Sequence, residues 1–204
     1  MIQLPTLYAI VDPSAFRESQ TMFRAVGDLE AAGVRLIQYR NKSGTAREIL
    51  DHARELKLRL KNSVRLIMND RPDLALAAGF DGVHVGQDDL SPEGARQVIG
   101  DGLWLGVSNH TSEQVQGADR SSADYIAVGP VFATAGKVNP DPVIGLEGVR
   151  TARALTRKPL VAIGGITRAN CRSVIDAGAD SVAVISDLLR EPGKSAEAFL
   201  RIIG

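Results

Sequence analysis

Short apolar runs alternate with longer amphipathic segments along the chain. The first run, Leu7–Val11, reads LYAIV, and an amphipathic segment over 21–32 follows it and ends at Gly33. Runs that are apolar at every position are typical of strands buried on both faces. A glycine directly after an amphipathic segment is typical of a helix C-terminus. The start of the chain therefore predicts one strand followed by one helix.

The same unit recurs about eight times. Strands are predicted at Leu7–Val11, 34–38, 65–68, Gly82–Val85, 104–107, Tyr125–Val128, Leu160–Ile163 and 181–185. Helices are predicted at 21–32, 45–60, Pro72–Ala78, Pro92–Ile99, 112–119, 146–155, 168–176 and 195–202. This alternation predicts an α/β fold with a parallel sheet, and eight units favour a closed (β/α)₈ TIM barrel over an open, doubly wound sheet. No linker interrupts the pattern, so we expect one domain over residues 1–204 with minimal insertions, the longest loop being 129–145.

Composition and charge narrow the class of protein. The chain has 24 Lys+Arg and 24 Asp+Glu, and this balance disfavours nucleic acid as a main partner, since phosphate backbones attract a basic excess. No apolar run approaches the roughly 20 residues of a membrane span, and the first residues lack the basic start of a signal peptide. Cys171 is the only cysteine, so no intrachain disulfide can form. We expect a cytoplasmic protein without a membrane partner, and a homodimer is left open.

Polar residues gather just after the predicted strands, which is where the active site of such a barrel lies. In chain order the strand-end positions, which also include some small and apolar residues, are Gln38, Tyr39, Arg40, Asn41 and Lys42, then Asn69 and Asp70, then Asp89, then Ser108, then Thr134, Ala135, Gly136 and Lys137, then Gly164 and Gly165, and finally Ile185 and Ser186.

These residues suggest two anion sites. The loops after the last two strands, at Gly164–Gly165 and at Ser186, can bind a phosphate through backbone N–H groups, although two glycines can also simply form a tight turn. Arg40, Lys42 and Lys137 are cations that could bind a more highly charged anion if they converge.

Two carboxylates accompany the cations. Asp70 and Asp89 follow neighbouring strands, and Mg²⁺ is commonly held by one or two carboxylates together with phosphate oxygens. The alternative is that each begins the helix that follows it, before Pro72 and Pro92 respectively. The residues alone leave both interpretations open.

The ordered motifs resemble the thiamine phosphate synthase family over nearly the whole chain. They are QYRNK at 38–42, NDRPDLA at 69–75, DGVHVGQDDL at 81–90, LGVSNHT at 105–111, GPVFATAGK at 129–137, VAIGGIT at 161–167 and AVIS at 183–186. The resemblance implies a transferase that joins 4-amino-2-methyl-5-hydroxymethylpyrimidine diphosphate to 4-methyl-5-(2-phosphoethyl)thiazole. The products are thiamine monophosphate and pyrophosphate, the route is a pyrimidine methylene cation, and the cofactor is Mg²⁺.

The resemblance also implies residue roles. Gln38 matches the pyrimidine-contacting glutamine, and Asp70 and Asp89 match the magnesium ligands. The diphosphate-binding positions are matched by Arg40, Lys42, Asn69, Ser108 and Lys137, of which Arg40, Ser108 and Lys137 are expected to act in catalysis. The thiazole-phosphate site is matched by Thr134, Gly165, Ile185 and Ser186, and the neighbouring Tyr39, Asn41, Ala135 and Gly136 are expected to contact substrate.

One position departs from the family pattern, and two alternatives stay open. The loop usually reads Thr-x-Thr-Lys, whereas here Gly136 replaces the second threonine, which removes one hydroxyl. A thiazole tautomerase shares the barrel but needs no metal site, and a non-catalytic barrel could bind a phosphorylated metabolite; the retained Asp70 and Asp89 favour the synthase. His84 could point into the barrel or have a structural role, and His110 is a weaker candidate.

Overall fold

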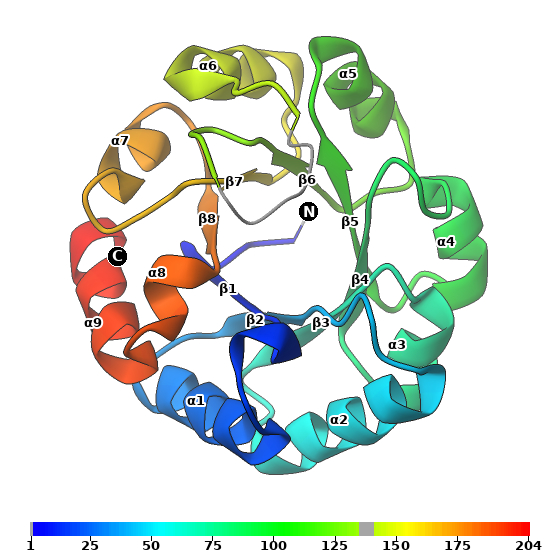
Figure 1. Cartoon of the computed structure of the whole chain (residues 1–204). Coiled ribbons are helices and arrows are strands. Elements are labelled where there is room, and N and C mark those ends of the chain that lie inside the picture. Colours follow the sequence, from blue (N-terminus) through cyan, green and yellow to red (C-terminus); the bar gives the residue numbers. More distant parts are fainter. Residues whose placement is uncertain (1, 135–140) are drawn as a thin grey trace.

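The computed structural model describes residues 2–134 and 141–204, and its strands close into a barrel (Figure 1). The strands are β1 Leu7–Val11, β2 Leu36–Tyr39, β3 Arg65–Asn69, β4 Gly82–Val85, β5 Trp104–Asn109, β6 Tyr125–Val128, β7 Leu160–Ile163 and β8 Ser181–Val184. Each strand pairs in parallel with the next, and β8 pairs with β1. The predicted (β/α)₈ barrel is confirmed.

Helices surround the strands as an outer ring (Figure 1). They are α1 Ser19–Ala31, α2 Ala46–Arg59, α3 Pro72–Ala78, α4 Pro92–Ile99, α5 Ser112–Arg120, α6 Gly145–Leu155, α7 Cys171–Asp176, α8 Ser186–Leu189 and α9 Pro192–Ile203, with a 3₁₀ turn at Pro13–Ala15. Within the described part of the chain, none of these helices is long and apolar enough to cross a membrane.

Two helix starts differ from the prediction by three residues and one helix was not predicted, whereas the other boundaries shift by at most two residues. The helix predicted from residue 168 begins at Cys171, because Asn170 Oδ1 accepts a hydrogen bond from the Thr167 N–H and holds residues 167–170 in a turn. The last helix begins at Pro192, a residue whose fixed φ suits a first helical position, and not at 195. The short helix α8 was not predicted, since four residues are too few to show helical periodicity.

Strand residues alternate between two apolar layers. The barrel interior is filled by one set of side chains, which includes Tyr8, Ile10, Leu36, Ile67, Tyr125, Ala127, Val161 and Ala183. The opposite set, which includes Ile37 and Met68, packs outward against the helices. Because side chains alternate along a strand, Gln38 and Asn69 lie on the inner side at the carboxyl end of the barrel. This inner end is the mouth of the barrel.

Candidate active site

The loop after β2 brings two cations to the mouth, and each already has a carboxylate partner. Arg40 Nη1 forms an ion pair with Asp12 Oδ2, and Asp12 directly follows β1. Lys42 Nζ lies 2.7 Å from Asp70 Oδ2 at the end of β3. The Arg40 and Lys42 side chains are 29% and 54% exposed, so both remain accessible to an incoming anion.

Asp70 and Asp89 form a pair of carboxylates at the ends of β3 and β4. Asp70 adopts a left-handed conformation with φ 60°, which aspartate tolerates better than most residues, and its N–H donates to the His84 carbonyl oxygen at 2.8 Å. Asp89 Oδ2 accepts a hydrogen bond from the Gly86 N–H at 2.8 Å. Partial burial raises the pKa of Asp89, and the hydrogen bond and negative charge of Asp70 raise it further.

This electrostatic pairing tests whether the site suits a divalent cation. Since Asp70 raises the pKa of Asp89, a positive charge between the two carboxylates would stabilise the charged form of Asp89, and hard oxygen donors are what Mg²⁺ prefers. Among residues 2–134 and 141–204, no group of three or more His, Cys, Asp or Glu side chains is arranged to hold a metal. The donor set therefore fits a cation that takes its other ligands from water and phosphate oxygens.

The inner wall of the mouth carries Gln38, His84 and Ser108. Gln38 Nε2 donates to the Tyr8 hydroxyl at 2.9 Å, and His84 Nε2 lies 2.9 Å from Ser108 Oγ. Gln87 Nε2, in the loop after β4, donates to the Ser108 carbonyl oxygen at 2.6 Å. Ser108 is thus held from its side chain and its backbone near the carboxyl end of β5.

The loops after β7 and β8 form the other side of the mouth. Gly164 and Gly165 have φ values of 97° and 63°, and a Cβ on Gly165 would lie 2.6 Å from the Ala133 carbonyl oxygen. The guanidinium of Arg168 binds Asp187 at 2.9 and 3.0 Å, which ties the loop after β7 to α8 and its first residue, Ser186. The glycines therefore serve a tight turn, and that turn also brings backbone close to α8.

Some predicted residues are not brought to the mouth. Tyr39 lies in the outer layer, where its hydroxyl is 2.8 Å from His52 Nδ1 on α2. Asn41 accepts hydrogen bonds from the Ser43 and Gly44 N–H groups at 3.3 and 2.8 Å, so it organises the loop after β2. Thr134 is half-buried, whereas Ala135, Gly136 and Lys137 lie outside the described residues.

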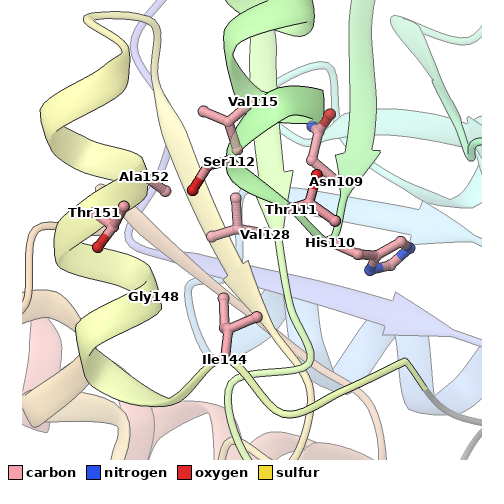
Figure 2. Close-up of a pocket in the computed structure, with 10 residues that line it drawn as sticks. All are labelled: Asn109, His110, Thr111, Ser112, Val115, Val128, Ile144, Gly148, Thr151 and Ala152. Carbon is pink, nitrogen blue, oxygen red and sulfur yellow. The ribbon is translucent and has the colours of Figure 1, made fainter.

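A hollow of about 200 Å³ lies between α5 and α6 (Figure 2). Its apolar wall comes from Val115, Val128, Ile144 and Ala152, with the Ser112 and Thr151 hydroxyls beside them. His110, at one end of this hollow, has Nδ1 2.6 Å from the Gly129 carbonyl oxygen. None of the residues predicted for substrate or metal binding lines this hollow.

Several residues of the site were missed by the sequence analysis. They are Asp12 beside Arg40, Tyr8 and Tyr125 beneath the mouth, and the Arg168–Asp187 pair. The sequence could have indicated the two tyrosines, because each occupies an inner position of a strand whose other inner residues are apolar. No pattern in the sequence indicated the ion pairs, because each joins segments that only the closed barrel brings together.

Comparison with known proteins identifies the family. A family model described as "Thiamine monophosphate synthase" matches residues 7–188. The chain is 61% identical to a thiamine-phosphate synthase of Koribacter versatilis, over 99% of this chain and 97% of that protein. It is 44% identical to one of Chloroflexus aurantiacus, over 94% and 88%. The solved thiamine phosphate pyrophosphorylase of Pyrococcus furiosus superposes with a TM-score of 0.87 at 32% identity, covering 97% of this chain and 95% of that one.

These relatives favour the synthase over both alternatives, the tautomerase-like barrel and the non-catalytic binding barrel. Their names and the extent of the match agree with the resemblance that the ordered motifs suggested. The activity is accordingly that of a thiamine-phosphate synthase, a transferase of thiamine biosynthesis. The chain belongs to the thiamine monophosphate synthase family.

Proposed function

We propose that the barrel mouth joins 4-amino-2-methyl-5-hydroxymethylpyrimidine diphosphate to 4-methyl-5-(2-phosphoethyl)thiazole. The observation that carries the proposal is the cluster of Lys42, Asp70 and Asp89, with an ion pair of 2.7 Å between the first two. This cluster lies on the same mouth as Ser108 and as the glycine turn after β7. One side therefore suits a metal-bound diphosphate, and the other suits a monophosphate.

The diphosphate is held by side chains from neighbouring strand ends. Arg40 and Lys42 supply positive charge, while Asn69 and Ser108 offer neutral donors from the inner wall. Asp70 and Asp89 would hold Mg²⁺, which, when bound, offsets the negative charge of the diphosphate. Lys137 matches a further diphosphate-binding position of the family and lies outside the described residues.

The bond to the diphosphate breaks first. The carbon–oxygen bond of the pyrimidine methylene breaks with its electron pair passing to the departing pyrophosphate, and Arg40, Lys42 and Ser108 stabilise the charge that develops there. The lone pair of the thiazole nitrogen then forms the new carbon–nitrogen bond. This step transfers no proton, so the protein needs only to hold the nitrogen in line and to exclude water.

The thiazole phosphate is bound by the opposite side of the mouth. Gly165, Ile185 and Ser186 contribute backbone N–H groups, and the Arg168–Asp187 pair keeps the two loops together. Thr134 contributes its hydroxyl, whereas Gly136 supplies no side chain where the family usually has a second threonine. We expect weaker binding of the thiazole phosphate than in relatives that keep this threonine, with no change in the reaction.

The setting follows from the reaction. Both substrates are small phosphorylated molecules, and we place the enzyme in the cytoplasm with other biosynthetic enzymes. The oligomeric state is open to sedimentation analysis, with a homodimer as the state to test.

The test is pyrophosphate release by the purified protein with Mg²⁺ and both substrates. We expect turnover that requires both substrates and is lost in Asp89→Asn. Asp101→Asn, which changes an exposed aspartate before β5, is the matched control and should keep full activity. If the wild-type protein releases no pyrophosphate, the proposed reaction is rejected. Full activity of Asp89→Asn would reject the metal site instead.

A further inference from the structure

Five polar side chains form one continuous hydrogen-bonded chain across the barrel interior. Gln38 Nε2 lies 2.9 Å from Tyr8 Oη, and Tyr8 Oη lies 3.1 Å from Tyr125 Oη. Tyr125 Oη is 3.1 Å from His84 Nδ1, and His84 Nε2 is 2.9 Å from Ser108 Oγ. The two ends are residues of the proposed substrate site. The three middle residues are buried, with exposed fractions of 1%, 0% and 7% for Tyr8, Tyr125 and His84.

The amide nitrogen at one end, together with the use of every hydroxyl hydrogen, selects one direction for the hydrogen bonds in this chain. An amide nitrogen only donates, a hydroxyl has one hydrogen to give, and a neutral imidazole donates from one nitrogen and accepts at the other. If each hydroxyl also uses its own hydrogen within the chain, Gln38 donates to Tyr8, Tyr8 to Tyr125, and Tyr125 to His84 Nδ1. His84 then carries its hydrogen on Nε2 and donates it to Ser108 Oγ. The hydrogen of the Ser108 hydroxyl is left for an acceptor in the mouth.

Burial favours the neutral forms of the middle residues. A charge on Tyr8, Tyr125 or His84 would lie inside the barrel, where the remaining side chains are largely apolar. A neutral imidazole has one donor and one acceptor, as the directed chain requires.

The sequence leaves room for this chain at Gly106. Gly106 is the inner residue of β5 between Trp104 and Ser108, and a Cβ there would overlap the Tyr125 ring and His84 Nδ1. The remaining inner layer is largely apolar. A row of buried polar groups is costly unless each is satisfied, so packing alone does not account for it.

We propose that Tyr8, Tyr125 and His84 are positioning residues that direct the Ser108 hydrogen toward the diphosphate. The same arrangement turns the Gln38 oxygen away from Tyr8. The oxygen can then accept a hydrogen bond from the pyrimidine amino group. If Gln38 presented its oxygen to Tyr8 instead, every hydrogen bond would reverse and the Ser108 hydrogen would point at His84. A ligand that donates a hydrogen bond to the Gln38 oxygen and accepts one from Ser108 therefore favours the first of these two arrangements at both ends of the chain of hydrogen bonds. This inference rests on the proposed function, which places those ligand groups.

Tyr125→Phe tests the proposal because it removes the donor to His84 Nδ1. His84 can then carry its hydrogen on Nδ1 and accept from Ser108, which takes the Ser108 hydrogen away from the diphosphate. We expect kcat/KM for the pyrimidine diphosphate to fall about 10-fold or more, the usual effect of losing one hydrogen bond to a charged group. In a Ser108→Ala background the same substitution should change kcat/KM by less than about twofold, since the hydroxyl is already absent.

Two further variants separate this role from simple destabilisation. Tyr8→Phe cuts the link to Gln38 but leaves Tyr125 able to donate to His84, so its effect should depend on Ser108 less than the effect of Tyr125→Phe does. Thr156→Val removes a buried hydroxyl that donates to Asp119 near the opposite end of the barrel, and it should lower stability without changing kcat/KM. Circular dichroism and thermal unfolding establish that each variant is folded.

Three results would overturn the positioning role. They are a Tyr125→Phe effect that is equal in both backgrounds, no effect in a folded Tyr125→Phe protein, and a wild-type His84 that carries its hydrogen on Nδ1. The ring nitrogen of His84 that carries the hydrogen is identified by ¹⁵N NMR of labelled histidine, and His84→Gln assigns the signal. This measurement is made on the wild type and needs no folded Tyr125 variant. Full activity of Ser108→Ala alone would instead show that the proposed substrate site is wrong.

Discussion

His84 should make the barrel lose stability in mild acid. Its imidazole is buried in the barrel interior, where Nδ1 lies 3.1 Å from the Tyr125 hydroxyl and Nε2 lies 2.9 Å from Ser108 Oγ. Protonation would place a charge among apolar side chains and turn the accepting nitrogen into a second donor that faces a hydroxyl. Burial accordingly lowers the pKa of His84 from 6.5 to about 4, and the nearby charge of Asp89 offsets only part of this effect.

The direction of the pH dependence follows from the order of the two pKa values. The unfolded chain binds the proton near pH 6.5 and the folded protein only near pH 4, so the unfolded state gains protons first as the pH falls. The stability contributed by neutral His84 is complete above pH 6.5 and is lost between about pH 6.5 and about pH 4. The full difference corresponds to about 3 kcal/mol, of which about 2 kcal/mol is already lost near pH 5.

Urea unfolding of the wild type and of His84→Gln at about pH 7.5 and about pH 5 measures this loss. The free energy of unfolding of the wild type should fall by about 2 kcal/mol more than that of His84→Gln. Carboxylates that titrate in the same range are common to both proteins and cancel in the comparison. Equal losses in the two proteins would refute the reasoning, because they would show that His84 has the same pKa folded and unfolded.

Three further substitutions test separate parts of the mouth. Asp70→Asn suits the left-handed backbone of this position but removes a charge, so pyrophosphate release should fall more than about 100-fold while the thermal midpoint changes little. Gly165→Ala places a Cβ 2.6 Å from the Ala133 carbonyl oxygen at a φ of 63°, so the free energy of unfolding should fall by about 1–3 kcal/mol and the KM for the thiazole phosphate should rise. Asp187→Asn weakens the contact with Arg168, and steady-state kinetics should show a several-fold higher KM for the thiazole phosphate with little change for the pyrimidine diphosphate.

The barrel could be predicted because its local signals agree with one another. The helix Pro92–Ile99 has Ser91 as its N-cap and proline at its first position, and the structure shows the Ser91 hydroxyl accepting from the Gly94 N–H. Where the signal was only apolar periodicity, the boundaries moved, as at the start of α9. The helix α8 has four residues and ends without a glycine, so neither its length nor its caps marked it in the sequence.

The sequence predicts which strand ends carry the site, but it does not predict which side chains of the site contact one another. The alternation of side chains along a strand could have separated two of the predicted residues. Gln38 and Tyr39 are neighbours in β2, so only one of them can face the interior, and Gln38 does. The contact of Tyr125 with His84 depends on how strands β4 to β6 are staggered in the closed barrel. No local pattern in the sequence carries that information.

The charges of the mouth explain why a chain with no net charge suits a diphosphate. The cations Arg40 and Lys42 are each paired with a carboxylate, Asp12 and Asp70, and Asp89 adds a further one. In this group of five residues, three carboxylates therefore face two cations, and such a group by itself repels a diphosphate. If Asp70 and Asp89 hold Mg²⁺ as proposed, the cation would reverse that balance and bring positive charge to the phosphate oxygens. The affinity for the diphosphate would then depend on the metal, and linkage would require the affinity for the metal to depend equally on the diphosphate.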